Sequence, residues 1–172
     1  YNDGARYLSL SGSGEPTLSP KSVTKVLELS HAYSPINLYS NGIRIGLDEN
    51  FCYEYLPLWK RLGLTSFYIT VHDIDEIENA RIYKTPRYPS LDLIISRIHN
   101  AKLKVRINLV IGKDTVNTYD KFVSIIERLK EIGADTVSAW PIRTLDDKID
   151  PINMPIDKEL DKMKTYVENS TY

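Results

Sequence analysis

Five short runs of branched, aromatic and aliphatic residues recur at intervals of about 30 to 40 residues, the spacing of successive βα units. The runs start near residues 6, 36, 66, 104 and 135, and helix-like spacing of apolar side chains follows them. Parallel strands need crossover connections of this length, usually a helix. The sequence therefore predicts an α/β fold of about five parallel βα units, either an open doubly wound sheet or a partial (β/α) barrel.

The bulk composition fits one domain. A chain of 172 residues with 42% hydrophobic side chains can fill a single core. We expect residues 1–143 to form the βα core, and residues 144–172, which are charged and interrupted by prolines, to form a linker followed by a helix over about 156–167. This last region resembles a later unit that has been cut off.

Charge and hydropathy argue against two kinds of partner. The formal net charge of -1 provides no global field for nucleic acid, so a nucleic-acid partner is not indicated. No apolar run reaches the roughly 18 residues of a membrane helix, so no membrane partner is expected. The start at Tyr1-Asn2-Asp3 lacks a methionine and a signal-peptide layout. We expect a cytoplasmic chain that is a fragment of a longer protein.

The first strand-like run leads into a glycine-rich turn, which we interpret as the main candidate site. Gly12 and Gly14 offer backbone conformations that side chains forbid, Glu15 adds a carboxylate, and Pro16 fixes a bend before a helix begins. Bare backbone groups in such a loop can bind a small polar group. The alternative is an ordinary βα turn in which Glu15 caps the loop.

Polar residues also follow the later strands, and the carboxyl ends of parallel strands share one rim. Arg106 and Asn108 alternate with apolar residues, so one face of this strand should look into a polar cavity. The rim residues expected to form a ligand site are Gly14, Glu15, Ser40, Asn41, Thr70, His72, Arg106, Asn108 and Arg143. His72 could equally be a structural histidine.

Three further features are interpreted as scaffold. Pro57 is expected to kink or split the helical region between Asp48 and Leu62. The charged connection over residues 74–89 reads as a solvated loop that could hold a short helix. The single cysteine, Cys52, should pack in the core, and it excludes a disulfide framework or a cluster built from this chain's cysteines alone.

The order of these motifs resembles the radical S-adenosylmethionine (radical SAM) family. That family carries a Gly-Gly-Glu-Pro motif, then a Thr-Asn-Gly-like turn, then a strand ending in Ser or Thr with an acidic neighbour, then a strand with a basic residue and Asn, and then a glycine. The matching residues here are Ser13-Gly14-Glu15-Pro16, Ser40-Asn41-Gly42, Thr70-Val71-His72-Asp73, Arg106-Ile107-Asn108 and Val110-Ile111-Gly112. The resemblance spans Tyr7 to about Arg143.

The resemblance implies a partial barrel that binds a [4Fe-4S] cluster and S-adenosylmethionine and cleaves the latter reductively to a 5′-deoxyadenosyl radical. By carry-over, Gly14, Glu15 and Pro16 would bind the methionine amino group, and Ser40 and Asn41 would lie beside the methionine moiety. Thr70 and His72 would lie near the ribose or carboxylate, and Arg106 and Asn108 near the carboxylate, ribose or substrate. The class implies an oxidoreductase or activating enzyme, an electron donor for the cluster, and a substrate that is a small molecule, peptide or protein.

The chain departs from the family in one respect. The family's Cys-x3-Cys-x2-Cys segment follows its first strand, which would precede Tyr1, and Cys52 matches none of its positions. We therefore expect no metal ligands in this chain and an inactive fragment of an active enzyme. Two alternatives remain: a cluster-free barrel enzyme of aldolase or isomerase type using Glu15, His72 and Arg106, or a non-catalytic binding module.

Overall fold

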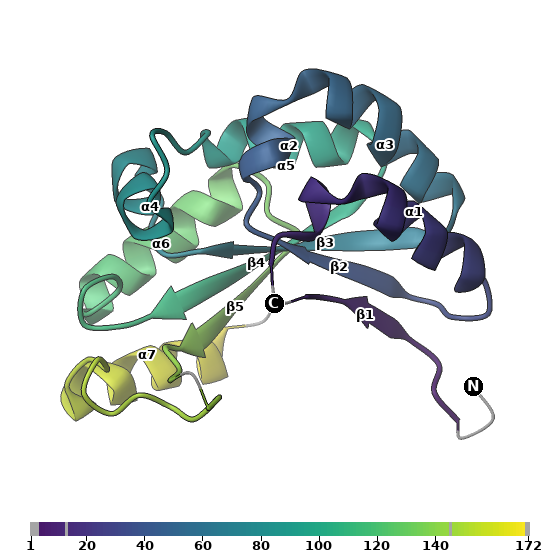
Figure 1. Cartoon of the computed structure of the whole chain (residues 1–172). Helices are drawn as coiled ribbons and strands as arrows, with labels where there is room; N and C mark the ends of the chain where they lie inside the picture. The colour runs from purple at the N-terminus through teal and green to yellow at the C-terminus, as the bar shows by residue number, and fades with distance from the viewer. Residues whose placement is uncertain (1–3, 13, 145, 171–172) are drawn as a thin grey trace.

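The protein forms one parallel sheet with helices packed mainly on one side (Figure 1). The computed structural model describes residues 4–12, 14–144 and 146–170. Within them, the sheet has five strands in the order β1-β2-β3-β4-β5, and every neighbouring pair is parallel. The strands are β1 (Leu8–Leu10), β2 (Ile36–Ser40), β3 (Leu64–Val71), β4 (Lys104–Ile111) and β5 (Thr136–Pro141). The predicted α/β fold and the predicted strand positions are therefore confirmed.

Helices connect the strands. A 3-10 turn, η1 (Pro16–Leu18), and the helix α1 (Pro20–Leu29) follow β1. The later helices are α2 (Ile43–Leu47), α3 (Glu49–Arg61), α4 (Glu76–Tyr83), α5 (Leu91–Asn100), α6 (Tyr119–Glu131) and α7 (Asp157–Asn169). Side chains of Asp48, Asp75, Ser90 and Thr118 accept hydrogen bonds from the first turns of α3, α4, α5 and α6, which explains where these helices begin.

The two faces of the sheet differ in chemistry because successive side chains of a strand point to opposite sides. The face under the helices is apolar, and its side chains Leu38, Phe67, Ile69, Val105 and Ile107 are fully buried. The other face carries rows of polar and aromatic residues, set by the strand register. One row runs through Tyr39, Tyr68 and Arg106, and the next runs through Thr70, Asn108 and Ser138.

One detail of the connections differs from the sequence prediction, and another agrees with it. Pro57 does not split its helix, because α3 continues from Glu49 to Arg61 with Pro57 inside it. Phe51, Leu56 and Trp59 of this helix are buried, and that packing offsets the backbone hydrogen bond that proline cannot donate. The charged connection over residues 74–89 contains α4, as the sequence suggested.

Cys52 lies in the core as predicted, where its thiol donates to the carbonyl oxygen of Ile45 at 3.1 Å. Burial raises the pKa of Cys52 to about 11, so the thiol is protonated at neutral pH. In residues 4–12, 14–144 and 146–170 no helix combines the length and apolar character needed to cross a membrane.

Candidate functional site

A cavity of about 380 Å³ lies where the loop after β1 meets the carboxyl ends of β2 and β3. This is the rim at which ligands bind in parallel sheets. Seven of the nine predicted cofactor-binding residues line it: Gly14, Glu15, Pro16, Ser40, Asn41, Thr70 and His72. The remaining lining residues are Ser11, Gly12, Tyr39 and Tyr83. Residues from three separate βα units thus form one site.

The Glu15 carboxylate ties the first turn to the second. Its Oε1 accepts hydrogen bonds from the Thr17 amide at 3.0 Å, the Thr17 hydroxyl at 2.7 Å and the Ser40 hydroxyl at 2.8 Å. Its Oε2 accepts from the Asn41 amide at 2.7 Å. Oε1 thus already accepts from three donors, whereas Oε2 accepts from one and keeps capacity for a further donor. Glu15 therefore connects the first turn of the rim to the second, and its Oε2 can still accept a hydrogen bond from a ligand.

The second turn requires its glycine. Gly42 has φ +76°, in the left-handed region, and a Cβ there would lie 3.0 Å from Ile94 Cδ1 and 3.2 Å from Ile69 Cγ2. The Ser40 hydroxyl accepts from the Gly42 amide at 3.0 Å, while the Asn41 side chain accepts from the Ile43 amide at 3.0 Å. Backbone geometry, packing and hydrogen bonds together fix Ser40-Asn41-Gly42 in this turn.

The first turn uses its glycines differently. Neither Gly12 nor Gly14 has a φ in the left-handed region, so the expectation that they adopt backbone conformations forbidden to side chains is wrong. A Cβ at Gly14 would meet no atom within 4 Å, and one at Gly12 would meet only the backbone of Gly14, at 3.9 Å. Open space therefore remains above this loop for an approaching molecule.

His72 forms another wall of the cavity. Its ring meets the ring of Tyr83 edge-on, with centroids 5.3 Å apart. Burial lowers the pKa of His72 below its ordinary value of 6.5, so the imidazole is neutral at neutral pH. Burial also raises the pKa of Tyr83, with a smaller contribution from the negative charge of Glu15. Among the described residues that line this cavity, Glu15 is thus the one charged group at neutral pH.

Two tyrosines hold the strand ends in place. The Tyr83 hydroxyl donates to the carbonyl oxygen of Thr70 at 2.7 Å, and the Tyr88 hydroxyl donates to that of Asn41 at 2.8 Å. Their rings stack with centroids 5.6 Å apart and an interplanar angle of 6°. Both contacts join residues far apart in sequence, so no local pattern reveals them.

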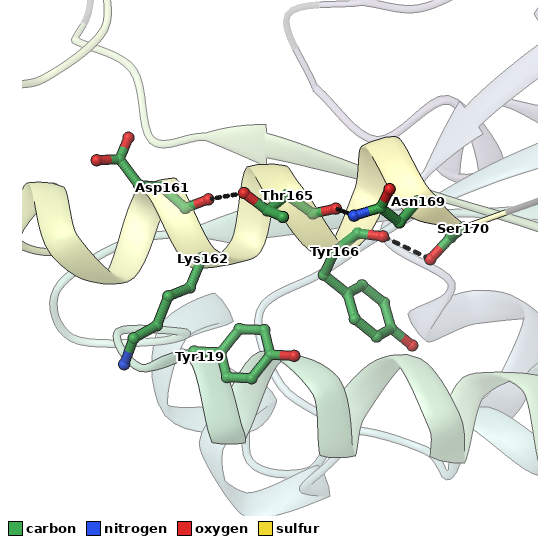
Figure 2. A pocket seen from close by; sticks show the side chains of 7 residues that line it. All are labelled: Tyr119, Asp161, Lys162, Thr165, Tyr166, Asn169 and Ser170. Atoms are coloured by element: carbon green, nitrogen blue, oxygen red, sulfur yellow. Dashed lines mark hydrogen bonds between the residues drawn. The ribbon is translucent and has the colours of Figure 1, made fainter.

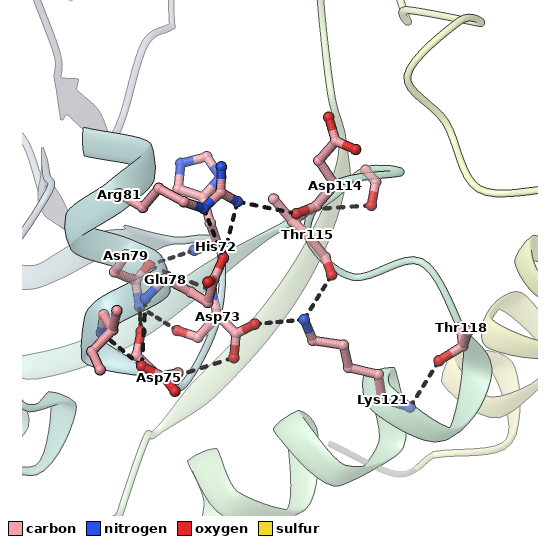
Figure 3. Close-up of polar contacts among 12 residues, drawn as sticks. His72, Asp73, Asp75, Glu78, Asn79, Arg81, Asp114, Thr115, Thr118 and Lys121 are labelled. Atoms are coloured by element: carbon pink, nitrogen blue, oxygen red, sulfur yellow. Dashed lines mark hydrogen bonds and ion pairs between the residues drawn. The ribbon is translucent and has the colours of Figure 1, made fainter. Parts of the chain in front are cut away.

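Asn79 fixes the turn after β3 (Figure 3). It is fully buried; its amide nitrogen donates to the carbonyl oxygens of Asp73 at 2.5 Å and Asp75 at 3.0 Å, while its oxygen accepts from the His72 amide at 3.0 Å. The Asp73 carboxylate forms an ion pair with the Lys121 ammonium at 2.6 Å. Asp73, the acidic neighbour of His72, therefore has a structural role. Asn79 of α4 fixes the backbone of His72 at the cavity rim.

Arg106 and Asn108 do not line the cavity that contains the other predicted residues. They share the polar face of the sheet, as their alternation predicted, but they lie on β4, beyond β3. The Arg106 guanidinium lies over the ring of Tyr68, 4.8 Å from its centroid. Arg143 is also outside this cavity, and it pairs with Asp147 at 3.0 Å.

The residues present do not supply a cluster site. In the described part of the chain, no three His, Cys, Asp or Glu side chains lie where they could hold a metal ion together. Cys52 is in the core beneath the helices, on α3. We therefore derive no step through an iron–sulfur cluster from these residues.

Figure 2 shows a second cavity, of about 670 Å³, between α6 and α7. Three of its polar side chains bond to the backbone of α7: Thr165 donates to the carbonyl of Asp161, Asn169 to that of Thr165, and Ser170 to that of Tyr166. Since these groups bond within their own helix, this cavity is a groove between packed helices and a weaker candidate than the rim.

No protein-family model and no curated protein matches the chain by sequence. Solved structures match its fold. Coproporphyrinogen III oxidase from Escherichia coli, described as a radical SAM enzyme, superimposes with a TM-score of 0.61 at 17% identity over 90% of this chain and 37% of that one. A radical SAM methyltransferase from Sphaerobacter thermophilus gives 0.65 at 10% identity over 94% and 48%.

A third match is SuiB from Streptococcus suis bound to S-adenosylmethionine, with a TM-score of 0.63 at 18% identity over 94% of this chain and 34% of that one. The chain thus spans between a third and a half of the length of these proteins. At these identities the likeness concerns the fold. The chain has the partial parallel βα fold of radical SAM enzymes, which confirms the resemblance seen in its sequence motifs.

Proposed function

We propose that this chain is the core of a radical SAM enzyme and that the cavity at the ends of β1, β2 and β3 binds S-adenosylmethionine. The observation that carries the proposal is the charge and shape of that cavity. Among the described residues that line it, the one charged group is the Glu15 carboxylate, and the loop at Gly12 and Gly14 leaves open space above the backbone. A cationic ligand with an ammonium and a sulfonium suits an acceptor-rich, negatively charged site.

The cavity residues have separate roles in the proposal. Glu15 Oε2 and the backbone of Gly14 accept from the ligand's ammonium, while Pro16 keeps the turn in shape. Ser40 and Asn41 hold the methionine end of the cavity, and Thr70 and neutral His72 bound the ribose end. A [4Fe-4S] cluster held elsewhere in the whole enzyme would supply the electron, received from a donor, for the reductive cleavage of S-adenosylmethionine to methionine and a 5′-deoxyadenosyl radical. The substrate and the donor are partners of the whole enzyme.

Calorimetric titration of S-adenosylmethionine tests the proposal, with Gly14→Val as the diagnostic variant. A Cβ at position 14 would meet no atom of the described residues within 4 Å, so folding should survive while the added methyl groups occupy ligand space. The matched control is Ser19→Val, because Ser19 lies outside the cavity and its side chain makes no capping hydrogen bond.

We expect the unmodified chain and Ser19→Val to bind S-adenosylmethionine, and Gly14→Val to bind at least roughly tenfold more weakly because of the steric overlap. Absence of binding to the unmodified chain and to any longer protein containing it would reject the proposal. That result would favour a cluster-free aldolase or isomerase, or a binding module.

A further inference from the structure

Two buried polar atoms on the polar face of the sheet have no hydrogen-bond partner among the residues that the structure describes. These atoms are Arg106 Nε and Asn108 Oδ1, and Asn108 as a whole is only 6% exposed. Buried polar groups in folded proteins are nearly always paired, because leaving one unpaired costs its full desolvation free energy. Two such atoms, two residues apart on one strand, indicate a missing hydrogen-bonding molecule.

The two residues lie at different distances from the cofactor cavity: Asn108 is the strand neighbour of Thr70, which lines that cavity, whereas Arg106 lies beyond Tyr68. The ring of Tyr68 meets that of Tyr39, a cavity residue, with centroids 5.1 Å apart, and supports the Arg106 guanidinium on β4. Arg106 instead lines a cavity of about 690 Å³ beside β5, with Ser138 and Trp140 on the same face. Tyr68 thus stands between the proposed cofactor site and Arg106.

We propose that Arg106 and Asn108 form a second subsite, which holds an oxyanion of the substrate, a carboxylate or a phosphate, with an adjacent N–H or O–H group. The guanidinium is always charged and presents donors suited to an oxyanion. The free Asn108 oxygen accepts from a donor next to that oxyanion. Stacking on Tyr68 fixes the plane of the guanidinium. This inference rests on the proposed function, because it places the substrate one strand away from the bound cofactor.

A substrate oxyanion fits this position better than the carboxylate of S-adenosylmethionine itself. Arg106 and Asn108 are absent from the lining of the cofactor cavity, and the Tyr39–Tyr68 contact lies between Arg106 and it, while Asn108 stands beside Thr70 at the edge of the cavity. A group bound at Arg106 would lie over the polar face of the sheet, beside the proposed radical source and outside its pocket. Specificity would then come from β4, while cofactor binding comes from β1, β2 and β3.

The test is an NMR titration of the Arg106 side-chain Nε–H signal with three probes. N-acetylglycine carries a carboxylate beside an N–H group, N-acetylglycinamide is its neutral counterpart, and inorganic phosphate represents phosphorylated substrates. Arg106→Met removes the charge while keeping an unbranched side chain to cover Tyr68. Lys104→Met is the control, because Lys104 is an exposed cation on the same face of the same strand, two residues earlier.

We expect N-acetylglycine or phosphate to shift the Arg106 signal saturably, the one that binds more tightly identifying the type of oxyanion. N-acetylglycinamide should bind at least about tenfold more weakly than N-acetylglycine if the carboxylate is bound. Lys104→Met should retain binding and Arg106→Met should lose it. The affinity for S-adenosylmethionine should change less than about threefold in Arg106→Met, because Arg106 lies outside the cofactor cavity.

Two outcomes would overturn the inference. One is the absence of a saturable shift with either oxyanion. The other is an S-adenosylmethionine affinity that falls about tenfold in Arg106→Met together with a shift of the Arg106 signal by S-adenosylmethionine, which would assign Arg106 to the cofactor carboxylate. Failure of the proposed function looks different, since the unmodified chain would then bind no S-adenosylmethionine at all.

Discussion

Replacing Glu15 with alanine should release the glycine loop of the candidate site from the end of β2. The carboxylate accepts four hydrogen bonds, two from Thr17 within the same turn and two from Ser40 and Asn41 on the next βα unit. The two distant bonds hold the glycine loop against the end of β2. Without them, the loop should lose its fixed position while the sheet and its apolar core remain.

The magnitude follows from those bonds. A hydrogen bond to a charged group contributes about 1.5–3 kcal/mol, and the two distant ones would together give about 3–6 kcal/mol if nothing replaced them. Glu15 is only partly buried, so water can satisfy part of the freed donors. We therefore expect Glu15→Ala to lower the unfolding free energy by about 2–3 kcal/mol. Glu15→Gln keeps the shape and one acceptor oxygen, and should cost about 1–2 kcal/mol.

Urea denaturation followed by circular dichroism measures both losses, with Glu127→Ala on the exposed side of α6 as control. The control should change the unfolding free energy by less than about 0.5 kcal/mol. A double-mutant cycle with Ser40→Ala should give a coupling of about 1 kcal/mol between the two side chains. The connecting role of Glu15 would be refuted if Glu15→Ala lowered the unfolding free energy no more than the control does. It would also be refuted if the double-mutant cycle showed no coupling between Glu15 and Ser40.

Three further predictions concern other parts of the molecule. Gly46→Ala should lower the unfolding free energy by about 1–3 kcal/mol in urea melts, because the added Cβ would overlap the ring of Pro89; an unchanged midpoint would refute that packing. The pKa of His72 is lowered by burial, so its neutral form contributes stability above about pH 6.5 that is lost as pH falls through the lower folded value. His72→Gln should therefore flatten the pH dependence of unfolding below about pH 6.5, and an unaltered slope would contradict the burial of a neutral imidazole. Anaerobic reconstitution of this chain should give no stable cluster absorbance near about 400 nm, because Cys52 is its single cysteine, whereas stoichiometric iron and sulfide would refute this.

Local patterns were sufficient to predict the fold. Strand spacing and the alternation of Arg106 and Asn108 depend on local sequence, and the structure confirms the five strands and places both side chains on the polar face of the sheet. The expected split of the helix at Pro57 was wrong because a local rule for proline ignores the burial of the rest of its helix. The prediction failed where tertiary packing outweighed a local preference.

The candidate site was only partly predictable for the same reason. Motif order placed Glu15 and His72 at one rim, where the structure also places them. The hydrogen bonds from Tyr83 and Tyr88 join residues 13 and 47 positions apart, and the separation of Arg106 from the rim cavity depends on which ring lies between them. Such contacts follow from the assembled sheet, so no single stretch of sequence contains them.

The most direct test of the central claim is to map S-adenosylmethionine binding on this chain by ¹H–¹⁵N chemical shifts. Binding in the rim cavity predicts that the largest shifts fall on the amides of Gly12, Gly14, Asn41 and His72, with little change at Tyr166 in the groove between α6 and α7. Shifts concentrated at that groove, or no shifts at a saturating concentration of S-adenosylmethionine, would contradict the account.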